Sequence, residues 1–342
     1  MYSLQGMRPR QASRSGKATW VVGRCAALCR QSEPMSETPQ DALTIAAVPP
    51  KDAAEALRLV FGGLAEGQDE DYVRTIAAAM QSGEIPAAGL LEARRGPRRV
   101  GAAWFQVLAG GAALVWPPRL APGEPVETAS RLMAAGCQRL SDAGVVAANA
   151  ILASVAPEED RLLREAGFMP LASLFYMACE DSVFPEARPA GRLAFEPWRM
   201  TEQERLAQLV QATYEGALDC PAADDPRSPE DVLAGYRAAG VFSPDHWLFV
   251  RHEGRDVGCL LLADHPAVGN MELVYLGVVP SSRGQGFGRE ICRHAQWLAR
   301  QAGRRRLVAA VDSANLPAVR MYAAAGFSVW DCRAAYGKRF GA

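Results

Sequence analysis

The most informative part of the sequence reads Leu273-Val274-Tyr275-Leu276-Gly277-Val278-Val279-Pro280-Ser281-Ser282-Arg283-Gly284-Gln285-Gly286-Phe287-Gly288-Arg289. An apolar run typical of a buried strand leads into a glycine-rich turn, and a helical pattern follows over 288–302. Amide groups freed at such a turn converge, and with the helix dipole they form a site for an anion such as a pyrophosphate. Side chains at Gly286 or Gly288 would obstruct the close approach of phosphates. The stretch therefore predicts an anion-binding loop.

Two other interpretations of a glycine turn compete with this one, a dinucleotide fingerprint and a mere tight turn. A dinucleotide fingerprint belongs on the first strand of its domain, with an acid about twenty residues further on, whereas this turn follows the fourth strand-like segment of its half. The form Arg-x-x-Gly-x-Gly instead resembles the pyrophosphate loop of the GNAT superfamily of N-acetyltransferases. That family often carries Asn, Ala, Tyr and Gly-Phe at fixed spacing downstream. The matching positions hold Asn315, Ala318, Tyr322, Gly326 and Phe327.

The two halves of the chain follow the same order of elements, β-α-α-β-β-β-α-β-α-β. Gly167-Phe168 matches Gly326-Phe327 at a separation of 159 residues, which an internal duplication explains. The predicted fold class is α/β with mixed sheets, in two tandem GNAT-like domains. We expect a degenerate domain over 41–180, a linker over 181–191, which holds two prolines and little that could be buried, and a catalytic domain over 192–342.

In the second half, the periodicity predicts six strands and four helices. The expected strands cover 193–198, 247–251, 257–263, 272–279, 306–311 and the residues from 327 onward, and the expected helices cover 201–214, 229–239, 288–302 and 317–325.

Bulk properties exclude several classes of function. The net charge of −1 arises from 37 basic and 38 acidic side chains, so no overall field draws the chain to nucleic acid or to a membrane. No apolar run approaches the roughly 18 residues that a membrane span needs. The eight cysteines form no C-x-x-C pair and have no metal-ligand spacing with the four histidines. We expect no metal, and reduced thiols in a cytoplasmic protein.

Residues 1–40 form a basic leader in which no amphipathic period can be found, and we expect it to be disordered. A signal peptide fits poorly because Arg24 interrupts the apolar stretch 20–28, whereas an organellar transit peptide fits the composition better. A third interpretation is that translation begins at Met35. A nucleic-acid role for the basic leader would then be excluded.

The resemblance to the GNAT superfamily implies acetyl-CoA as co-substrate and a set of backbone contacts to it. The exposed backbone of Leu276 and Val278 would bind the pantetheine like an added strand, since unpaired backbone groups of a buried strand need a partner. The amides that would hold the pyrophosphate belong to Arg283, Gly284, Gln285, Gly286, Phe287 and Gly288.

The resemblance also implies roles for three side chains. Tyr322 would protonate the departing thiolate; the alternative is an aromatic core residue, since Tyr322 shares a helical face with Ala318 and Ala325. Asn315 would orient CoA, and it also suits an ordinary helix N-cap. Glu272 is our candidate general base, because partial burial raises a carboxyl pKa toward the value this role requires; a solvated acid at a strand end is the alternative.

The acceptor is expected to be a primary amine of a small molecule or of a peptide or protein. Tyr214 and Asp219 lie in the loop region that borders the acceptor site in similar domains, together with Asp224 and Asp225. Three acids there suggest a cationic acceptor, and a solvated turn rich in Asp and Pro is the alternative.

The first half carries a degraded version of the same site. The 159-residue offset places Ala156 where Asn315 stands and Leu163 where Tyr322 stands, and prolines and acids replace the glycines over 117–129. We expect this half to lack CoA and to shape the acceptor site, in an architecture similar to that of tandem acetyltransferases such as mycothiol synthase. The alternative function is that of a non-catalytic CoA-responsive binding protein.

Overall fold

The computed structural model describes residues 42–62, 69–221 and 226–341. The predicted leader over 1–40 lies outside these ranges. Among the helices of the described residues, none is long and apolar enough to cross a membrane.

The first half alternates strands and helices in the predicted order. Its strands are β1 (Leu43–Ala47), β2 (Leu90–Arg95), β3 (Arg98–Leu108), β4 (Ala112–Leu120), β5 (Ala147–Leu152) and β6 (Met169–Glu180). Its helices are α1 (Ala53–Val60), α2 (Asp69–Ser82), α3 (Glu127–Asp142) and α4 (Pro157–Glu165).

The second half repeats this order. Its strands are β7 (Ala194–Pro197), β8 (Trp247–His252), β9 (Arg255–His265), β10 (Asn270–Val278), β11 (Arg306–Asp312) and β12 (Ser328–Arg339). Its helices are α5 (Gln203–Tyr214), α6 (Pro229–Arg237), α7 (Phe287–Gln301) and α8 (Leu316–Ala324).

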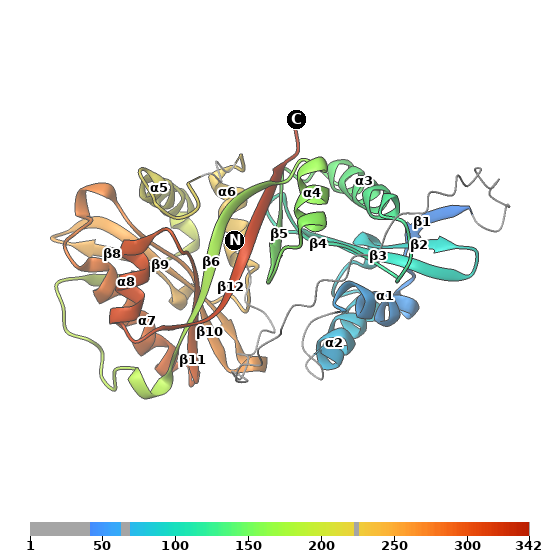
Figure 1. The fold of residues 1–342 in the computed structure, drawn as a ribbon. Coiled ribbons are helices and arrows are strands. Elements are labelled where there is room, and N and C mark those ends of the chain that lie inside the picture. Colours follow the sequence, from blue (N-terminus) through green and yellow to red (C-terminus); the bar gives the residue numbers. More distant parts are fainter. Residues whose placement is uncertain (1–41, 63–68, 222–225, 342) are drawn as a thin grey trace, which may run out of the picture.

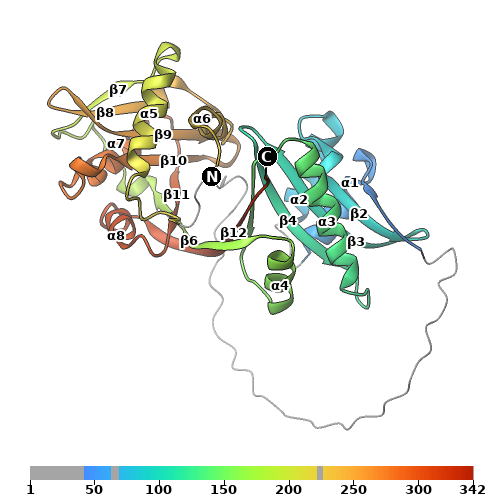
Figure 2. The same cartoon turned by 90° about the horizontal axis from the view of Figure 1, so that it is seen from above.

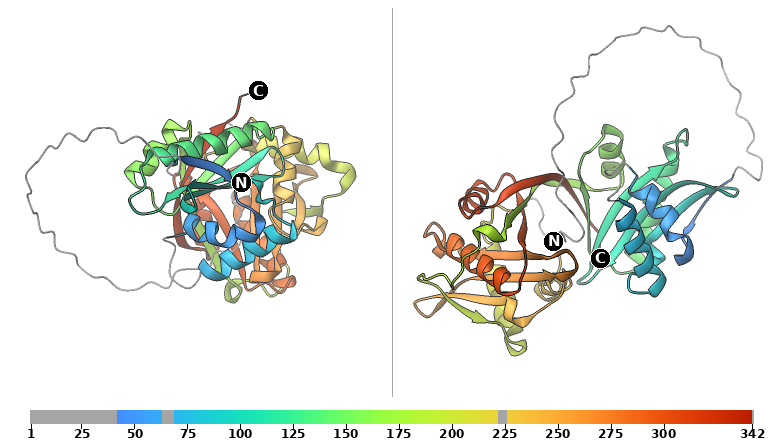
Figure 3. Two further views of the ribbon diagram at one scale, coloured as in Figure 1. Left: turned by 90° about the vertical axis from the view of Figure 1, so that its right-hand side faces the viewer. Right: turned by 90° about the horizontal axis from the view of Figure 1, so that it is seen from below.

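The sheets of the two halves are joined into one. Across the described residues the order of the 12 strands is β1-β2-β3-β4-β5-β12-β6-β11-β10-β9-β8-β7. The last strand of each half therefore pairs with the fifth strand of the other half, β6 with β11 and β12 with β5. In Figure 1 the strands β6 and β12 run side by side through the middle of the molecule, and Figures 2 and 3 show the two halves connected along them.

This exchange bears on the domain boundaries expected from sequence. Periodicity predicts a sheet in each half, but it cannot identify which neighbour a strand pairs with. Both exchanged strands are 12 residues long and pair on both edges. A boundary between 180 and 192 therefore assigns β6 to the first half, although one edge of β6 pairs with β11 of the second half.

Helices cover both faces of the sheet in the second half. The α7 and α8 face holds a buried cluster that includes Met271, Ile291 and Ala325, and the α5 and α6 face holds a second cluster that includes Leu206 and Val274. Each fully buried Leu or Ile side chain stabilises the fold by roughly 1.5–3 kcal/mol relative to an exposed one. The strand β10 thus has a packed layer on each side.

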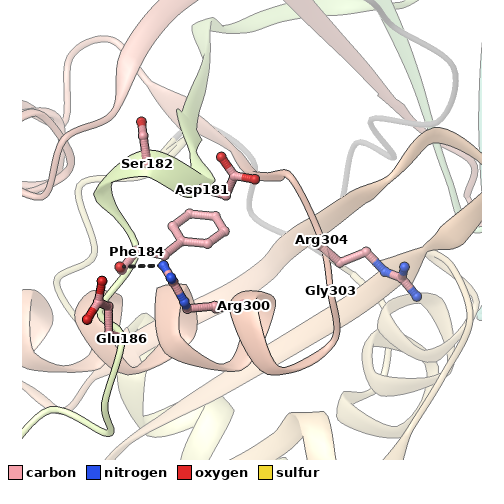
Figure 4. Close-up of a pocket in the computed structure, with 7 residues that line it drawn as sticks. All are labelled: Asp181, Ser182, Phe184, Glu186, Arg300, Gly303 and Arg304. Carbon is pink, nitrogen blue, oxygen red and sulfur yellow. Dashed lines mark hydrogen bonds between the residues drawn. The ribbon is translucent and has the colours of Figure 1, made fainter.

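The segment predicted as a linker is more ordered than its composition suggests. Residues Asp181–Val183 form a short 3-10 helix, and Phe184 is buried in the cluster of α7 and α8. Arg300 Nη1 donates to the Phe184 carbonyl at 3.1 Å, beside a cavity of about 520 Å³ at the C-terminal end of α7 (Figure 4). The expectation that this segment buries little was wrong at Phe184, whose aromatic ring supplies enough apolar surface to anchor the chain.

Candidate functional site

The strands β10 and β11 part beside the glycine turn. Their parallel pairing covers only three residue pairs, from Asn270 with Arg306 to Glu272 with Val308, while β10 continues along β9 as far as Val278. Beyond Glu272 one edge of β10 is therefore open to another partner.

The backbone direction along this open edge follows from the pairing with β9. Val279 N donates to Val257 O at 3.0 Å, so the residues that face β9 are Val279, Gly277 and Tyr275. Leu276 and Val278 face away from β9, toward the gap between β10 and β11. The backbone groups expected to bind pantetheine thus lie on the open edge.

The glycine turn leads directly into the first turn of α7. Gly284 has φ +76° and Gly286, which precedes the first helical residue, has φ +82°. These left-handed conformations strain any residue with a Cβ. The first N–H groups of a helix have no partner within it, so those of Phe287 and Gly288 point outward from the N-terminal end, where the helix dipole is positive.

Gly288 has a different reason to be glycine. Its φ is not in the left-handed region, and the nearest atom to an added Cβ would be Met321 Cγ, at an ordinary contact distance of 3.7 Å. Packing among the described residues therefore has room for a side chain there. A ligand close to the helix start would use that space, which fits a bound pyrophosphate.

Arg283 is directed inward. Its amide donates to Pro280 O at 3.2 Å, and its guanidinium donates to the carbonyls of Val278, Gly216 and Thr213 at 3.1, 2.9 and 2.9 Å. The side chain ties the end of β10 to the end of α5. Of the six amides that the sequence singles out for the pyrophosphate, that of Arg283 is engaged inside the loop.

A second arginine holds the outer side of the loop. Arg192 Nη2 donates to Gln285 O at 2.7 Å and to Glu290 Oε1 at 2.8 Å, and its guanidinium carbon lies 4.8 Å from the centre of the Phe287 ring. Gln285 Nε2 lies 3.5 Å from Ser281 O. The loop is therefore fixed from both sides before any ligand binds.

Tyr322 is buried on α8, in the cluster that also holds Phe287 and Ile291 of α7. It is 6% exposed and packs against Phe327 with ring centroids 5.2 Å apart. Burial raises the pKa of Tyr322 well above its ordinary value, and the nearby Cys292 and Asp219 add to the effect. The phenol therefore keeps its proton at neutral pH, as a proton donor must.

Asn315 and Asp219 meet at the end of β11. Asn315 Oδ1 caps α8 by accepting from Ala318 N at 3.3 Å, and its side chain lies close enough to Asp219 to lower the pKa of that carboxyl group. Asp219 Oδ1 accepts from Asp312 N at 2.8 Å. Desolvation raises the pKa of Asp219 and the charge of Asp312 acts in the same direction, whereas the backbone and Asn315 hydrogen bonds lower it.

The contact with Asp312 N ties the Asp219 carboxyl group to the backbone of β11. The residue as a whole is exposed, but its carboxyl group joins the loop after α5 to β11 beside the helix that carries Tyr322. One carboxyl oxygen of Asp219 is thus engaged with the backbone of β11, and the role of Asp219 toward a cationic acceptor stays a prediction. Asp224 and Asp225 lie outside the described residues.

Glu272 is fully buried rather than a solvated acid at a strand end. It is 2% exposed, and its Oε2 lies 2.8 Å from His265 Nε2. Tyr176 of β6 lies close enough for the charge of Glu272 to add to the rise in tyrosine pKa that burial causes. A strand of the first half thereby contributes to the surroundings of Glu272, which the sequence could not reveal.

A group of aromatic hydroxyls lies on the α5 and α6 face of β10. Tyr214 Oη lies 2.5 Å from Tyr236 Oη, and Tyr275 Oη lies 2.6 Å from Thr213 Oγ1. The rings of Tyr236 and Tyr275 stack with centroids 5.5 Å apart. Tyr214 remains 39% exposed, which is compatible with its expected place beside the acceptor. Sequence reasoning missed Tyr236 and Tyr275, although Tyr275 directly precedes Leu276.

The corresponding region of the first half is filled by acids. Glu124 Oε1 accepts from Thr128 Oγ1 at 2.6 Å and from Arg95 Nε at 3.1 Å, at the start of α3. Glu159 occupies the position that the 159-residue offset pairs with Ala318. It is buried, and burial raises the pKa of its carboxyl group. The same offset pairs Glu124 with Arg283, so an acid lies where the glycine turn of the second half begins.

Comparison with known proteins identifies the class. Residues 207–327 match the model of the Acetyltransferase (GNAT) family. A mycothiol acetyltransferase of Arthrobacter sp. (strain FB24) is 28% identical over 156 residues, which cover 44% of this chain and 41% of the relative. A mycothiol acetyltransferase of Pseudarthrobacter chlorophenolicus is 29% identical over 186 residues, covering 50% of this chain and 54% of the relative. The chain thus spans about half the length of these curated relatives.

Solved structures share the fold. A GCN5-related N-acetyltransferase from Sphaerobacter thermophilus superimposes with a TM-score of 0.64 at 16% identity, covering 90% of this chain and 98% of that one. A tandem GNAT protein from the clavulanic acid biosynthesis pathway gives a TM-score of 0.53 at 14% identity, covering 88% and 99%. The chain carries a GNAT acetyltransferase domain in its second half, within a tandem GNAT architecture.

Proposed function

We propose that the second half of this protein transfers an acetyl group from acetyl-CoA to a primary amine of a small molecule or of a peptide or protein. One observation carries the proposal. The edge of β10 that is open beyond Glu272 leads into the glycine turn at the start of α7, and the buried cluster under α7 also contains Tyr322.

The backbone supplies the binding groups for the donor. Leu276 and Val278 would bond the pantetheine along the open edge of β10, and the amides from Gly284 to Gly288 would bond the pyrophosphate at the positive end of the α7 dipole. Arg283 and Arg192 would act by holding this loop. Asn315 would act by capping α8 and fixing the loop that carries Asp219.

The chemistry is a direct attack. The amine nitrogen, after losing a proton to Glu272 directly or through a water molecule, forms a bond to the thioester carbonyl carbon. The C–S bond then breaks and the thiolate takes a proton from Tyr322, while the nitrogen, which the new bond has left positively charged, loses its second proton and so restores the phenol. The products are an amide and free CoA. Holding amine and thioester together supplies much of the rate in such transfers, and a positioned acid or base contributes roughly 10²–10⁴-fold.

The acceptor side is formed by elements of both halves. Tyr214 and the loop after α5 border it from the second half, and β6 brings Tyr176 close to Glu272 from the first. The names of the bacterial relatives point to a small molecule, so an amine precursor related to mycothiol belongs in any acceptor panel. The free cysteines of the described residues fit a reducing compartment, and we place the protein in the cytoplasm.

The test is release of free CoA thiol from acetyl-CoA over a panel of amines, with Tyr322→Phe as the comparison. Thiol release that depends on one class of amine and falls in the variant would establish the enzyme and its acceptor class. Tight binding of acetyl-CoA without thiol release on any amine would favour a CoA-responsive binding protein instead.

A further inference from the structure

A buried histidine contacts the candidate general base from the side away from the donor. His265 is the last residue of β9 and lies opposite Asn270, whereas Glu272 lies opposite Ala263. Directly opposed residues share one face of a sheet, and so do residues two apart on a strand, so His265 and Glu272 project from the same face. Because the open edge of β10 begins beyond Glu272, His265 lies on the other side of this carboxyl group from the proposed donor site.

The histidine and the glutamate form a hydrogen-bonded pair that is closed off from solvent. His265 Nε2 lies 2.8 Å from Glu272 Oε2, and the two residues are 9% and 2% exposed. A buried carboxylate is costly unless hydrogen bonds stabilise its charge. An ionised carboxylate only accepts hydrogen bonds, so Nε2 carries the proton and donates it whenever Glu272 is ionised. The contact therefore supports the form of the side chain that a general base needs.

The imidazole ring of His265 is held in place by the backbone that follows α6. A Cβ atom at Gly240 would lie 2.7 Å from His265 Cε1 and 2.8 Å from the Asp264 carbonyl oxygen, closer than packed atoms approach. Only glycine allows the chain to lie this near the ring. The same segment is fixed to β9, since Val241 N donates to Asp264 O at 2.8 Å and Asp264 N donates to Val241 O at 3.1 Å. The direction of Nε2 is thus set by the fold.

The other titratable and charged groups near the pair come from several elements. They are Asp264 of β9, Tyr176 of β6, Arg304 after α7 and His246 of the 3-10 helix before β8. Arg304 Nη2 donates to Asp264 Oδ2 at 2.8 Å, so these two charges are paired with each other. Burial raises the pKa of Tyr176 and lowers that of His246, so both side chains are uncharged at neutral pH. The pair of His265 and Glu272 therefore lies among groups that are neutral or already paired.

We propose that His265 is a positioning residue for the general base: it holds the Glu272 carboxylate ionised at Oε2 and directs Oε1 toward the acceptor amine. The inference rests on the proposed acetyltransferase function and extends it to a residue that does not touch the substrate. The amine proton passes to Oε1 of Glu272, while the bond from His265 Nε2 to Oε2 stays in place. His265 therefore leaves the proton balance of the reaction unchanged and contributes orientation and charge stabilisation.

The experiment separates a hydrogen-bond donor from a packing ring. His265→Gln keeps an N–H donor and loses the ring, whereas His265→Phe keeps a ring and loses the donor. His246→Phe is the matched control, because the charged neighbours of this half-buried histidine are Asp264, Asp245 and Arg304. Circular dichroism checks the fold of each variant, and His265→Leu replaces His265→Phe if the latter does not fold.

The readout is thiol release from acetyl-CoA as a function of pH, with the amine that gives the fastest release in the panel above. His265→Phe is expected to lower kcat about tenfold or more, the effect of one hydrogen bond to a charged group, with the Kd of acetyl-CoA unchanged. The acidic limb of its kcat/KM profile should move to higher pH, because a carboxylate that loses a donor takes up a proton more readily. His265→Gln should stay within about threefold of the unmodified protein.

The pattern across the variants decides between the two roles. Loss of kcat in folded His265→Phe, with activity kept in His265→Gln and His246→Phe, supports the proposal. Loss in His265→Gln with activity kept in His265→Phe assigns a packing role and overturns it, as do equal kcat values in all four proteins. If both His265 variants lose activity, a shifted acidic limb in His265→Phe supports the proposal and an unshifted limb overturns it.

Failure of the inference is distinguishable from failure of the proposed function. Thiol release by the unmodified protein that is indifferent to both His265 variants overturns the positioning role alone. No thiol release by the unmodified protein with any amine overturns the acetyltransferase function and the positioning role with it.

Discussion

Glu272 Oε2 lies 2.8 Å from His265 Nε2, and both side chains are buried at the place where β10 leaves β11. The Glu272 carboxyl group contacts His265 and lies beside the open edge that we assign to the donor. We predict that Glu272→Gln lowers kcat by roughly 10²-fold, the usual contribution of a positioned base, while the Kd of acetyl-CoA stays unchanged. Steady-state kinetics and calorimetry on the same preparation would measure the two quantities. An unchanged kcat would leave Glu272 as a structural partner of His265 alone.

Tyr322→Phe keeps the ring that packs on Phe327 and removes only the hydroxyl. Because the phenol is the proposed proton donor, we predict a loss of kcat of roughly 10²-fold or more with little change in melting temperature. Tyr336→Phe is the matched control, since that hydroxyl donates to Asp160 in the degenerate half. Equal kcat values for Tyr322→Phe and the unmodified protein would show that Tyr322 serves packing alone.

His294 makes stability depend on pH. Its pKa is about 4 in the folded state against 6.5 for the ordinary group, so the unfolded chain binds more protons between these values. The free energy of unfolding therefore falls as pH drops from about 6.5 to 4, by up to about 3 kcal/mol from this group. Denaturant titrations across this window should show that the unmodified protein loses up to about 3 kcal/mol more of its free energy of unfolding than His294→Phe does between pH 6.5 and 4. Parallel curves would contradict the assignment.

The exchange of β6 and β12 predicts how fragments behave. A fragment of residues 192–342 lacks β6, so β11 loses seven pairs and β12 loses both neighbours. We expect it to be unfolded or aggregated, because exposed strand edges and uncovered apolar surface destabilise it. A fragment of residues 168–342 keeps the β11-β6-β12 pairs and should retain more structure. Cooperative unfolding of the shorter fragment, as judged by circular dichroism, would argue for independent linear domains.

Much of the fold could be predicted from local patterns. The helix expected over 288–302 is found over 287–301, and the strand expected over 257–263 is found over 255–265, because apolar periodicity reports the face that each element buries. Partner choice between strands is non-local, and so the exchange of β6 and β12 could not be predicted. The end of β10 was expected at Val279 and lies at Val278.

The candidate site was also predictable only in part from the sequence. Backbone features were predictable, since glycines at 284 and 286 report left-handed conformations and their spacing follows the family loop. Side-chain directions were not. Arg283 turns inward to three carbonyls, and Asp219 binds a backbone amide of β11. Tyr176 comes from a strand of the other half and has no signal in the local sequence.

The most direct test of the central claim is isothermal titration of acetyl-CoA into the protein and into Gly288→Glu. The variant is favourable to helix formation, because an acid in the first turn complements the dipole and Gly288 has no strained φ. Its side chain would nevertheless fill the space and repel the phosphates. We predict one acetyl-CoA site per chain, because Glu124 and Glu159 occupy the corresponding region of the first half. In a folded Gly288→Glu variant we predict a loss of affinity of more than about tenfold. Unchanged binding in that variant, or no binding to the unmodified protein, would contradict the account.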